Sequence, residues 1–437
     1  MRSLNSAQHE IGGFEDEPQW RVSRPSLLEA GRPWTEIRSE LLLRKSDDFD
    51  WRGGRLPIYV YYDNEELLEV SKEAYNLFFS ENALGKKAFP SLARMEDEVV
   101  GMSLELFHAP ADAAGSFTSG GTESVFLAVK TARDYFLAKR GAVPRPKIVI
   151  PITAHPVFDK AAEYLGLEVT RTSLRNDRRC DVEALAAAID ERTILIAGSA
   201  PCYPFGVYDP LAELAQVARE RGVWLHVDAC LGGFLAPFAK LEGFDIPDFD
   251  FSIDGVTSLS ADLHKFGYCA RGASIILYRS ETLKSHQPFR FANWPRGAYS
   301  TETFLGSRPG GSIASAWAVM QYLGRVGYRR LACKILETKH RLVTGIQEIT
   351  GLEVVMPSDL NVVLYRSTEQ RVDINAVAEL MAEKQWFVGR SRDPQAIHLA
   401  LNAVHAPVID RYVSDLREAV NHARLSGRSG SYDDTAY

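Results

Sequence analysis

A chain of 437 residues exceeds the usual size of one domain, so we expect two or three structural units. With 46% hydrophobic and 24% charged residues, its composition is that of an ordinary globular protein, and the net charge of −7 argues against nucleic-acid binding. No window of about 18 apolar residues occurs, and the N-terminus lacks the apolar core of a signal peptide, so we expect neither a membrane span nor a secretory signal.

The five cysteines are an odd number, are widely spaced and form no CxxC pair. This pattern predicts reduced thiols in a cytoplasmic protein and disfavours a disulfide framework or a zinc site. The five positions are Cys180, Cys202, Cys230, Cys269 and Cys333.

The N-terminal part of the chain predicts an arm followed by one helix. Residues 1–25 are polar and irregular, which is typical of a flexible segment, and residues 33–45 have the pattern of a helix. We therefore expect residues 1–55 to form an arm and helix outside the main domain.

The middle of the chain alternates strand and helix patterns, which is the signal for a parallel sheet with crossover helices. Helices are expected at 123–139, 181–189 and 210–220. Strands are expected at 147–151, 168–172, 193–199, 223–228, 251–254 and 274–278. The sequence thus predicts an α/β fold with a mostly parallel central sheet in a large domain over residues 56–320.

The last third predicts a smaller α+β domain over residues 321–424. A long helical region begins near residue 312 and continues to 348, and strands are expected at 352–356, 361–365 and 397–401. Helices are expected at 374–384 and 407–423. The tail over residues 425–437 is poor in apolar residues and is predicted to be disordered.

A small-residue turn at 118–124 leads into the first helix of the large domain. Gly120 and Gly121 let a backbone approach a ligand closely, and a helix N-terminus offers unpaired N–H groups and the positive end of its dipole. Thr122 adds a hydroxyl. The turn is therefore a candidate phosphate site, although, considered alone, it is more simply explained as a helix cap.

Asp228 and Lys265 complete a pattern that pyridoxal phosphate needs. Asp228 ends an apolar strand, where open α/β sheets place ligand sites, and a carboxylate there is costly unless it is paired. Lys265 follows 37 positions later, before Phe266, in a context unlike an exposed helix surface. A lysine would form the Schiff base, an aspartate would pair with the pyridinium nitrogen, and the turn would hold the phosphate. A helix-capping aspartate and a surface lysine are the alternative interpretations.

His155 follows the strand expected at 147–151. Considered alone it is more simply a core histidine. In a cofactor site it would stack over the pyridine ring and help to position a proton.

Five segments together resemble the fold-type I pyridoxal phosphate enzymes of the group II decarboxylase superfamily, and within it the sphingosine-1-phosphate lyase family. The resemblance extends from about Trp51 to Ala423. Amino-acid decarboxylases of the superfamily usually have tryptophan after the lysine, so Phe266 and the pair Cys230-Leu231 favour the lyase branch. The segments are SGGTES at 119–124, HPVFDKAA at 155–162, HVDACLGGF at 226–234, SADLHKFGY at 260–268 and GSRPG at 306–310.

The resemblance implies a role for each matching residue. Lys265 would be the Schiff-base lysine, Asp228 the pyridinium partner and His155 the residue stacked on the ring. The family is a homodimer with shared active sites, so one phosphate ligand would come from the second subunit. The residues implied to bind the cofactor phosphate are Gly121, Thr122, His264 and, from the second subunit, Ser307.

The residues expected to bind the substrate differ from those of the family. The family's histidine on the substrate phosphate is missing from residues 82–90, where Lys86 or Lys87 would supply a cation instead. Arg271 stands where the family has a lysine. A family tyrosine on the substrate phosphate maps to Tyr61, with the neighbouring tyrosines at 59 and 62 as alternatives. The eukaryotic relatives carry a membrane anchor, and we expect none here.

The resemblance implies a lyase that splits the Cα–Cβ bond of a phosphorylated amino alcohol, with sphingosine 1-phosphate as the type substrate. The products would be a long-chain aldehyde and phosphoethanolamine. An amino-acid decarboxylase or a retro-aldolase acting on a β-hydroxy amino acid is the alternative, since the altered substrate end fits either. A non-catalytic binding protein is a third hypothesis, which the intact Lys265, Asp228 and His155 disfavour.

Overall fold

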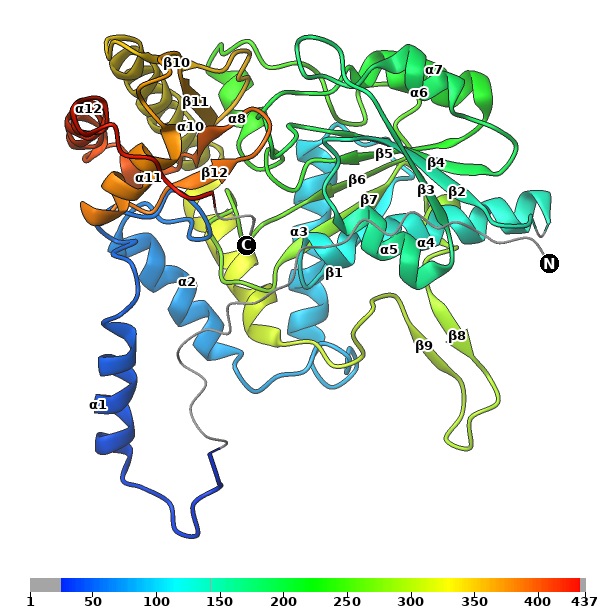
Figure 1. The fold of residues 1–437 in the computed structure, drawn as a ribbon. Helices are drawn as coiled ribbons and strands as arrows, with labels where there is room; N and C mark the ends of the chain where they lie inside the picture. The colour runs from blue at the N-terminus through cyan, green and yellow to red at the C-terminus, as the bar shows by residue number, and fades with distance from the viewer. Residues whose placement is uncertain (1–24, 142, 433–437) are drawn as a thin grey trace. The chain divides into compact units, whose positions relative to one another are not determined.

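The computed structural model describes residues 25–141 and 143–432 (Figure 1). The chain forms two compact units, residues 1–48 and residues 49–437. In the first unit, α1 (Trp34–Lys45) confirms the helix predicted at 33–45, and Arg44 and Lys45 lie in its last turn, where the helix dipole favours cations. The arm predicted over residues 1–25 lies, except for Pro25, outside the described residues.

A seven-stranded sheet forms the centre of the second unit. Five neighbouring strands are parallel, and β7 runs opposite to both β6 and β1. This arrangement confirms the predicted α/β fold with a mostly parallel sheet. The order across the sheet is β1 (Ala114–Thr118), β7 (Ser274–Tyr278), β6 (Ser258–Ala261), β5 (Trp224–Asp228), β4 (Thr193–Ser199), β2 (Lys147–Pro151) and β3 (Glu168–Thr172).

Helices cover both faces of this sheet because its strands are apolar on both sides. On β7, Ile275 and Leu277 belong to one core, while Ile276 and Tyr278 belong to the other, as the two-residue period of a strand requires. The first core is shared with α3 (Pro90–Leu106), α7 (Leu211–Arg221) and α8 (Ala236–Leu241), and the second with α4 (Gly121–Arg140) and α5 (Val157–Leu165).

A second, antiparallel sheet follows the long helix α10 (Gly310–Gln347), which is broken at Gly324, where φ is 52°. This sheet has its own core against α11 (Ile374–Glu383) and α12 (Ile409–Ser426), in the region predicted to be α+β. The domain boundary expected at residues 320–321 stays a prediction. The strand order is β10 (Leu352–Val354), β11 (Val362–Ser367), β13 (Ala396–Ala400) and β12 (Gly389–Ser391).

Several elements were not predicted from the sequence. They include α3, β1 and the hairpin of β8 (Phe289–Phe291) and β9 (Tyr299–Thr301), which projects at the lower right of Figure 1. The others are α2 (Glu65–Leu77), α8, α9 (Glu281–Lys284), β12 and η1 (Ala403–His405), whereas α6 (Val182–Ala187) confirms the helix predicted at 181–189.

The strand predicted at 251–254 is wrong. These residues form turns, and the strand that follows β5 in the sheet begins at Ser258. The guanidinium of Arg279 explains the turns, because it donates to the backbone carbonyls of Phe251, at 3.1 Å, and Ile253. Those carbonyls are satisfied by a distant side chain, which the local sequence does not reveal.

The first part of the tail predicted to be disordered is instead held against α11. Arg428 pairs with Glu379 at 2.8 Å and with Glu383 at 2.7 Å, and Ser431 N donates to Glu379. Paired charges order this segment even though it contributes little apolar surface. Residues 433–437 lie outside the described residues.

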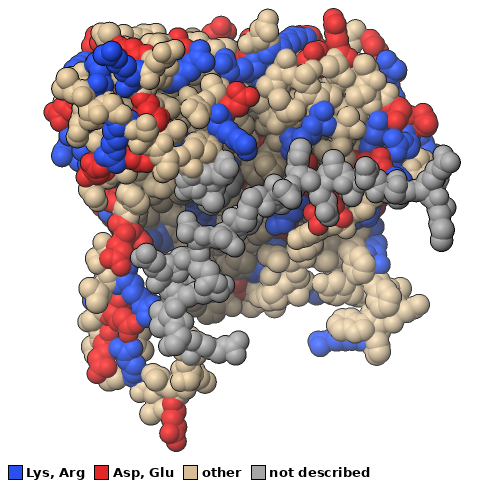
Figure 2. All heavy atoms as spheres, viewed as in Figure 1, with Lys and Arg blue, Asp and Glu red and all other residues tan. Residues whose placement is uncertain are grey.

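Acidic and basic side chains are interspersed over the face shown in Figure 2. Within residues 25–141 and 143–432, no helix combines the length and the apolarity needed to cross a bilayer.

Candidate active site

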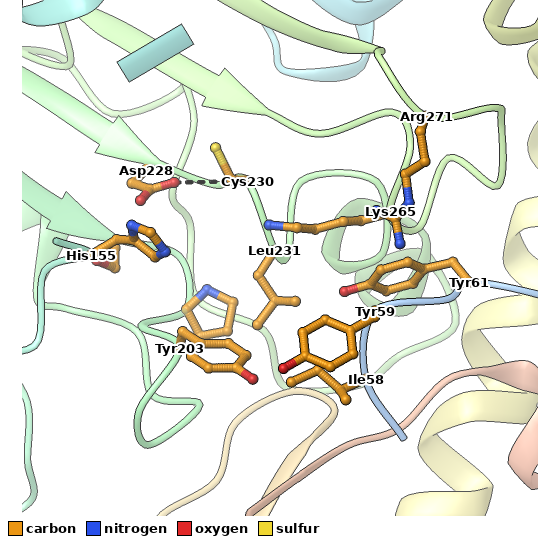
Figure 3. Close-up of a pocket in the computed structure, with 12 residues that line it drawn as sticks. Ile58, Tyr59, Tyr61, His155, Tyr203, Asp228, Cys230, Leu231, Lys265 and Arg271 are labelled. Atoms are coloured by element: carbon orange, nitrogen blue, oxygen red, sulfur yellow. Dashed lines mark hydrogen bonds between the residues drawn. The ribbon is translucent and has the colours of Figure 1, made fainter. Parts of the chain in front are cut away.

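A cavity of about 410 Å³ opens at the carboxyl ends of the parallel strands (Figure 3). Ser199 and Asp228 are the last residues of β4 and β5, and His155 and Lys265 follow β2 and β6. Because parallel strands end at the same edge, residues distant in sequence meet there. The predicted residues Lys265, His155, Asp228, Tyr61 and Arg271 all line this cavity.

Asp228 is a buried carboxylate aimed into the cavity (Figure 3). The backbone N–H of Cys230 donates to its Oδ1 at 3.0 Å, which fixes the side chain at the start of the loop that follows β5. Two residues earlier, His226 is fully buried between Ser258 and Ser260, whose hydroxyls lie 2.8 and 3.2 Å from its ring nitrogens. The strand β5 therefore ends in a carboxylate, that of Asp228, which is held in a fixed orientation.

Lys265 forms an ion pair with Asp262, whose Oδ2 lies 2.9 Å from the lysine Nζ. Burial lowers the pKa of Lys265, but the charge and hydrogen bond of Asp262, together with Tyr61 and Cys230, outweigh burial, so the pKa of Lys265 is raised. The sequence analysis named no anionic neighbour for Lys265, and the structure places the Asp262 carboxylate there.

His155 is held in one orientation by the backbone of α5. The N–H of Val157 donates to its Nδ1 at 3.1 Å, so Nδ1 acts as an acceptor. Burial lowers the pKa of His155, although the nearby carboxylate of Asp228 opposes the shift. His155 therefore offers a neutral ring to the cavity near pH 7.

Arg271 and Tyr61 form the opposite side of the cavity (Figure 3). The guanidinium carbon of Arg271 lies 5.6 Å from the centre of the Tyr61 ring, and that ring meets Phe266 edge-on at 4.9 Å. A permanent cation thus lies across the cavity from the His155 and Asp228 side, as an anionic group at the far end of a substrate would require.

The turn at 118–124, which contains Gly121, lies against the carboxylate of Asp262. A Cβ on Gly121 would approach Cys230 Sγ to 2.9 Å and both carboxylate oxygens of Asp262 to 3.0 Å, so only glycine fits. His264 Nε2 lies 3.7 Å from Asp262 Oδ2, and Thr122 is exposed. Gly121 and Thr122 begin α4, whose first N–H groups have no partner within the helix. This backbone cradle at a helix N-terminus fits a phosphate-bearing cofactor.

Ser307 lies apart from Lys265 within one protomer. Its Oγ accepts a hydrogen bond from Asn82 Nδ2 at 3.0 Å, and its neighbours Gly306 and Arg308 line a second cavity of about 500 Å³. Lys86 and Lys87 line this second cavity and not the first. The structure therefore groups the segment 82–87 with Ser307, and it does not bring either to Lys265 of the same chain.

Two tyrosines that line the first cavity were missed or left open by the sequence interpretation. Tyr203 belongs to the loop after β4, and its backbone carbonyl lies 2.9 Å from Nε2 of His398 on β13. Tyr59 has a left-handed backbone with φ of 66°, which is uncommon outside glycine. The end of β4 was a signal for Tyr203, because loops at the carboxyl ends of parallel strands carry ligand sites. Ile58, Pro201 and Leu231 add apolar surface.

Residues 72–368 match the family model described as the pyridoxal-dependent decarboxylase conserved domain. The chain is 40% identical over 399 residues to the sphingosine-1-phosphate lyase of Arabidopsis thaliana, covering 90% of this chain and 73% of the relative. It is 36% identical over 398 residues to sphingosine-1-phosphate lyase 1 of Mus musculus, covering 90% and 69%.

Solved structures are similar over nearly the whole chain. The sphingosine-1-phosphate lyase of Burkholderia pseudomallei superimposes with a TM-score of 0.87 at 35% identity, over 93% of this chain and 95% of that one. The glutamate decarboxylase of Lactobacillus brevis superimposes with a TM-score of 0.80 at 21% identity, over 92% and 96%, which shows a shared fold.

Proposed function

Because the chain belongs to the pyridoxal-dependent decarboxylase family, and within it to the sphingosine-1-phosphate lyases, we propose that it cleaves the Cα–Cβ bond of a substrate like sphingosine 1-phosphate. The protein is a pyridoxal-phosphate-dependent lyase, and its proposed products are a long-chain aldehyde and phosphoethanolamine. The observation that carries the proposal is the cavity shared by Lys265, Asp228 and Arg271.

Pyridoxal phosphate, when bound, supplies an electron sink for the bond that breaks at the substrate's Cα. We propose that Lys265 attaches the cofactor, that Asp228 holds a proton on the ring nitrogen and that His155 lies against the ring. The backbone of Gly121 and Thr122 would bind the phosphate, helped by His264. Support comes from the single cavity that Lys265, Asp228 and His155 line and from the close packing around Gly121 at the start of α4.

Arg271 would hold the anionic distal group of the substrate, with Tyr61 beside it. A charge-assisted hydrogen bond contributes about 1.5–3 kcal/mol, so Arg271→Ala should lower kcat/KM for the phosphorylated sphingoid base by about 10- to 150-fold. The measurement is turnover of phosphorylated and dephosphorylated sphingoid base by both proteins. Arg271→Lys keeps the charge and serves as the matched control. Equal turnover of the two substrates by the wild type would contradict the phosphate preference.

Product analysis distinguishes the proposed reaction from the alternative. A decarboxylase would release CO₂ from an amino acid, and a retro-aldolase would split a β-hydroxy amino acid to an aldehyde and a smaller amino acid. Aldehyde together with phosphoethanolamine, in equal amounts, is the expected outcome. Release of CO₂ without aldehyde would favour the decarboxylase.

We further propose a homodimer in which Ser307 completes the partner's site. Within one chain Ser307 contacts Asn82 and lies outside the Lys265 cavity, yet its segment resembles a cofactor loop. Lys86 and Lys87 line the same cavity as the residues flanking Ser307, so they would reach the partner's substrate together with it.

Mixed dimers test this arrangement. Lys265→Ala and Ser307→Tyr homodimers should each be inactive, because each lacks one part of every site. After subunit exchange, a mixed dimer has one site with both intact parts, so activity should return. Exchange is verified by differently tagged subunits, and a mixture that exchanges without any recovery of activity would contradict shared sites.

The thiols support a cytoplasmic location. All five cysteines are free, and Cys180, Cys202, Cys230 and Cys269 are buried. Free thiols persist in reducing compartments, so we propose that the enzyme works in the cytoplasm.

A further inference from the structure

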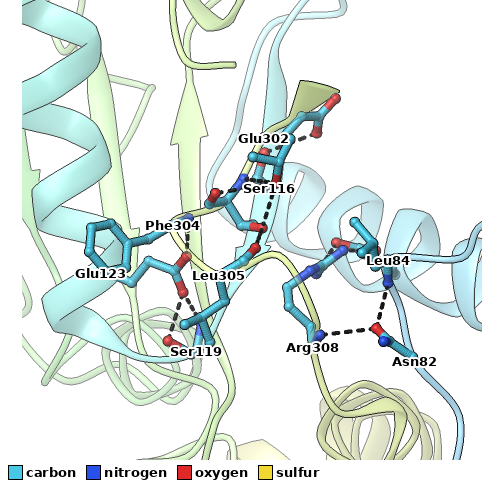
Figure 4. Close-up of polar contacts among 12 residues, drawn as sticks. Asn82, Leu84, Ser116, Ser119, Glu123, Glu302, Phe304, Leu305 and Arg308 are labelled. Atoms are coloured by element: carbon cyan, nitrogen blue, oxygen red, sulfur yellow. Dashed lines mark hydrogen bonds and ion pairs between the residues drawn. The ribbon is translucent and has the colours of Figure 1, made fainter. Parts of the chain in front are cut away.

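Glu123 joins two segments that are distant in the sequence (Figure 4). Its Oε2 accepts hydrogen bonds from the backbone N–H and the hydroxyl of Ser119, both at 2.7 Å. Its Oε1 accepts from the backbone N–H of Phe304 at 2.6 Å. Glu123 is 6% exposed, so both carboxylate oxygens accept hydrogen bonds in a place where an unpaired charge would be costly.

Helix capping explains only one half of this arrangement. A glutamate in the first turn of a helix commonly reaches back to the N–H groups just before the helix, as Glu123 does toward Ser119. The bond from Phe304, 181 positions away, has no part in a cap. Glu123 therefore connects the turn at 119–122 to the segment that contains Ser307.

That segment is held at its other end as well. Asn82 Nδ2 donates to Ser307 Oγ at 3.0 Å, and the buried Arg308 pairs with Glu96 through both terminal nitrogens, at 2.7 and 3.0 Å. Residues 304–308 thus run between two anchors, the Glu96 pair and the Glu123 carboxylate. Because both anchors are fixed to helices of the same subunit, the position of Ser307 depends on them.

We infer that Glu123 is a positioning residue for the cofactor phosphate, fixing the turn that binds the phosphate in its own subunit and the segment that delivers Ser307 to the partner's phosphate. This inference rests on the proposed cofactor site and on the proposed dimer. One carboxylate in each subunit would thus support two active sites, its own and that of the partner.

Binding of two cofactor forms to the full-length protein tests the inference. Pyridoxal phosphate and pyridoxal differ only in the phosphate, so a residue that acts through the phosphate site affects one and spares the other. Glu123→Gln replaces one acceptor oxygen by an NH₂ group, which cannot accept from Ser119 or Phe304. Loss of one charge-assisted contact should raise the Kd for pyridoxal phosphate by about 10- to 150-fold, with the Kd for pyridoxal unchanged.

Glu302→Gln is the matched control, because Glu302 lies two residues before Phe304, and its carboxylate contacts Lys284 at 3.3 Å and Ser116 at 3.4 Å rather than the turn at 119–122. It should bind both cofactor forms as the wild type does. Equal weakening of both forms by Glu123→Gln would show a general structural role and overturn the inference, as would unchanged affinity for both. A wild type that binds neither form would instead refute the proposed cofactor site. Thermal unfolding without cofactor checks that each variant folds.

Discussion

Lys265→Ala should abolish turnover and remove the visible absorbance band of covalently attached cofactor. Among the described residues that line the cavity, only Lys265 has an amine that can attach the cofactor aldehyde, and its Nζ lies beside the buried carboxylate of Asp262 at 2.9 Å. Alanine leaves no nucleophile at that place. The measurements are the absorbance spectrum of the purified protein and product release under saturating substrate.

Two further variants test whether the loss of activity comes from the missing amine, from the missing charge or from the loss of any lysine. Lys265→Arg keeps a cation beside Asp262 but provides no amine that can attach the cofactor, so it should be as inactive as alanine. Lys240→Ala removes a half-exposed lysine that pairs with Asp248 on the surface, and it should behave as the wild type. Wild-type absorbance and activity in Lys265→Ala would show that another residue holds the cofactor.

Asp228→Asn should lower kcat by at least about 10²-fold, or ~2.7 kcal/mol of barrier. Asparagine keeps the shape and can still accept the hydrogen bond that Cys230 N donates to Oδ1 at 3.0 Å. What is lost is the negative charge that would keep the ring nitrogen protonated, and with it the strength of the electron sink. Cofactor affinity should fall much less than kcat.

Steady-state kinetics and cofactor titration of the same preparation test this separation. A second preparation with Asp228→Ala, which also loses the Cys230 contact, shows how much of the effect comes from shape. Activity of Asp228→Asn within a factor of a few of the wild type would exclude the proposed role of the charge.

The sequence predicted the strands that have a clear local pattern and failed where a distant partner decides the structure. Residues 147–151 and 193–199 are fully buried strands at their predicted positions. The segment 251–254 is also partly apolar. It forms turns instead of a strand, because Arg279 donates hydrogen bonds to two of its backbone carbonyls. The strand β1 contains Gly115 and Ser116 and has weak strand propensity, so its pairing with β7 is a tertiary effect.

The residues of the cavity also divide into those that the sequence could predict and those that it could not. Asp228 and His155 could be predicted because each comes directly after or at the end of a recognisable strand. The end of β4 pointed to the loop that contains Tyr203, but not to the place of this tyrosine in the cavity, since the loop is held by His398 from the second sheet. Asp262 is only three residues from Lys265, but its effect on the lysine depends on a burial that the sequence does not show.

Cys230 bears on the fate of the proposed aldehyde product. Its thiol lines the cavity, and burial, followed by the carboxylates of Asp228 and Asp262, raises its pKa well above the usual value. Because the thiolate is the nucleophilic form, a thiol kept protonated is a poor trap for a carbonyl carbon. A thiol in this state would therefore add slowly to the proposed aldehyde product, which would limit capture of the product in the cavity.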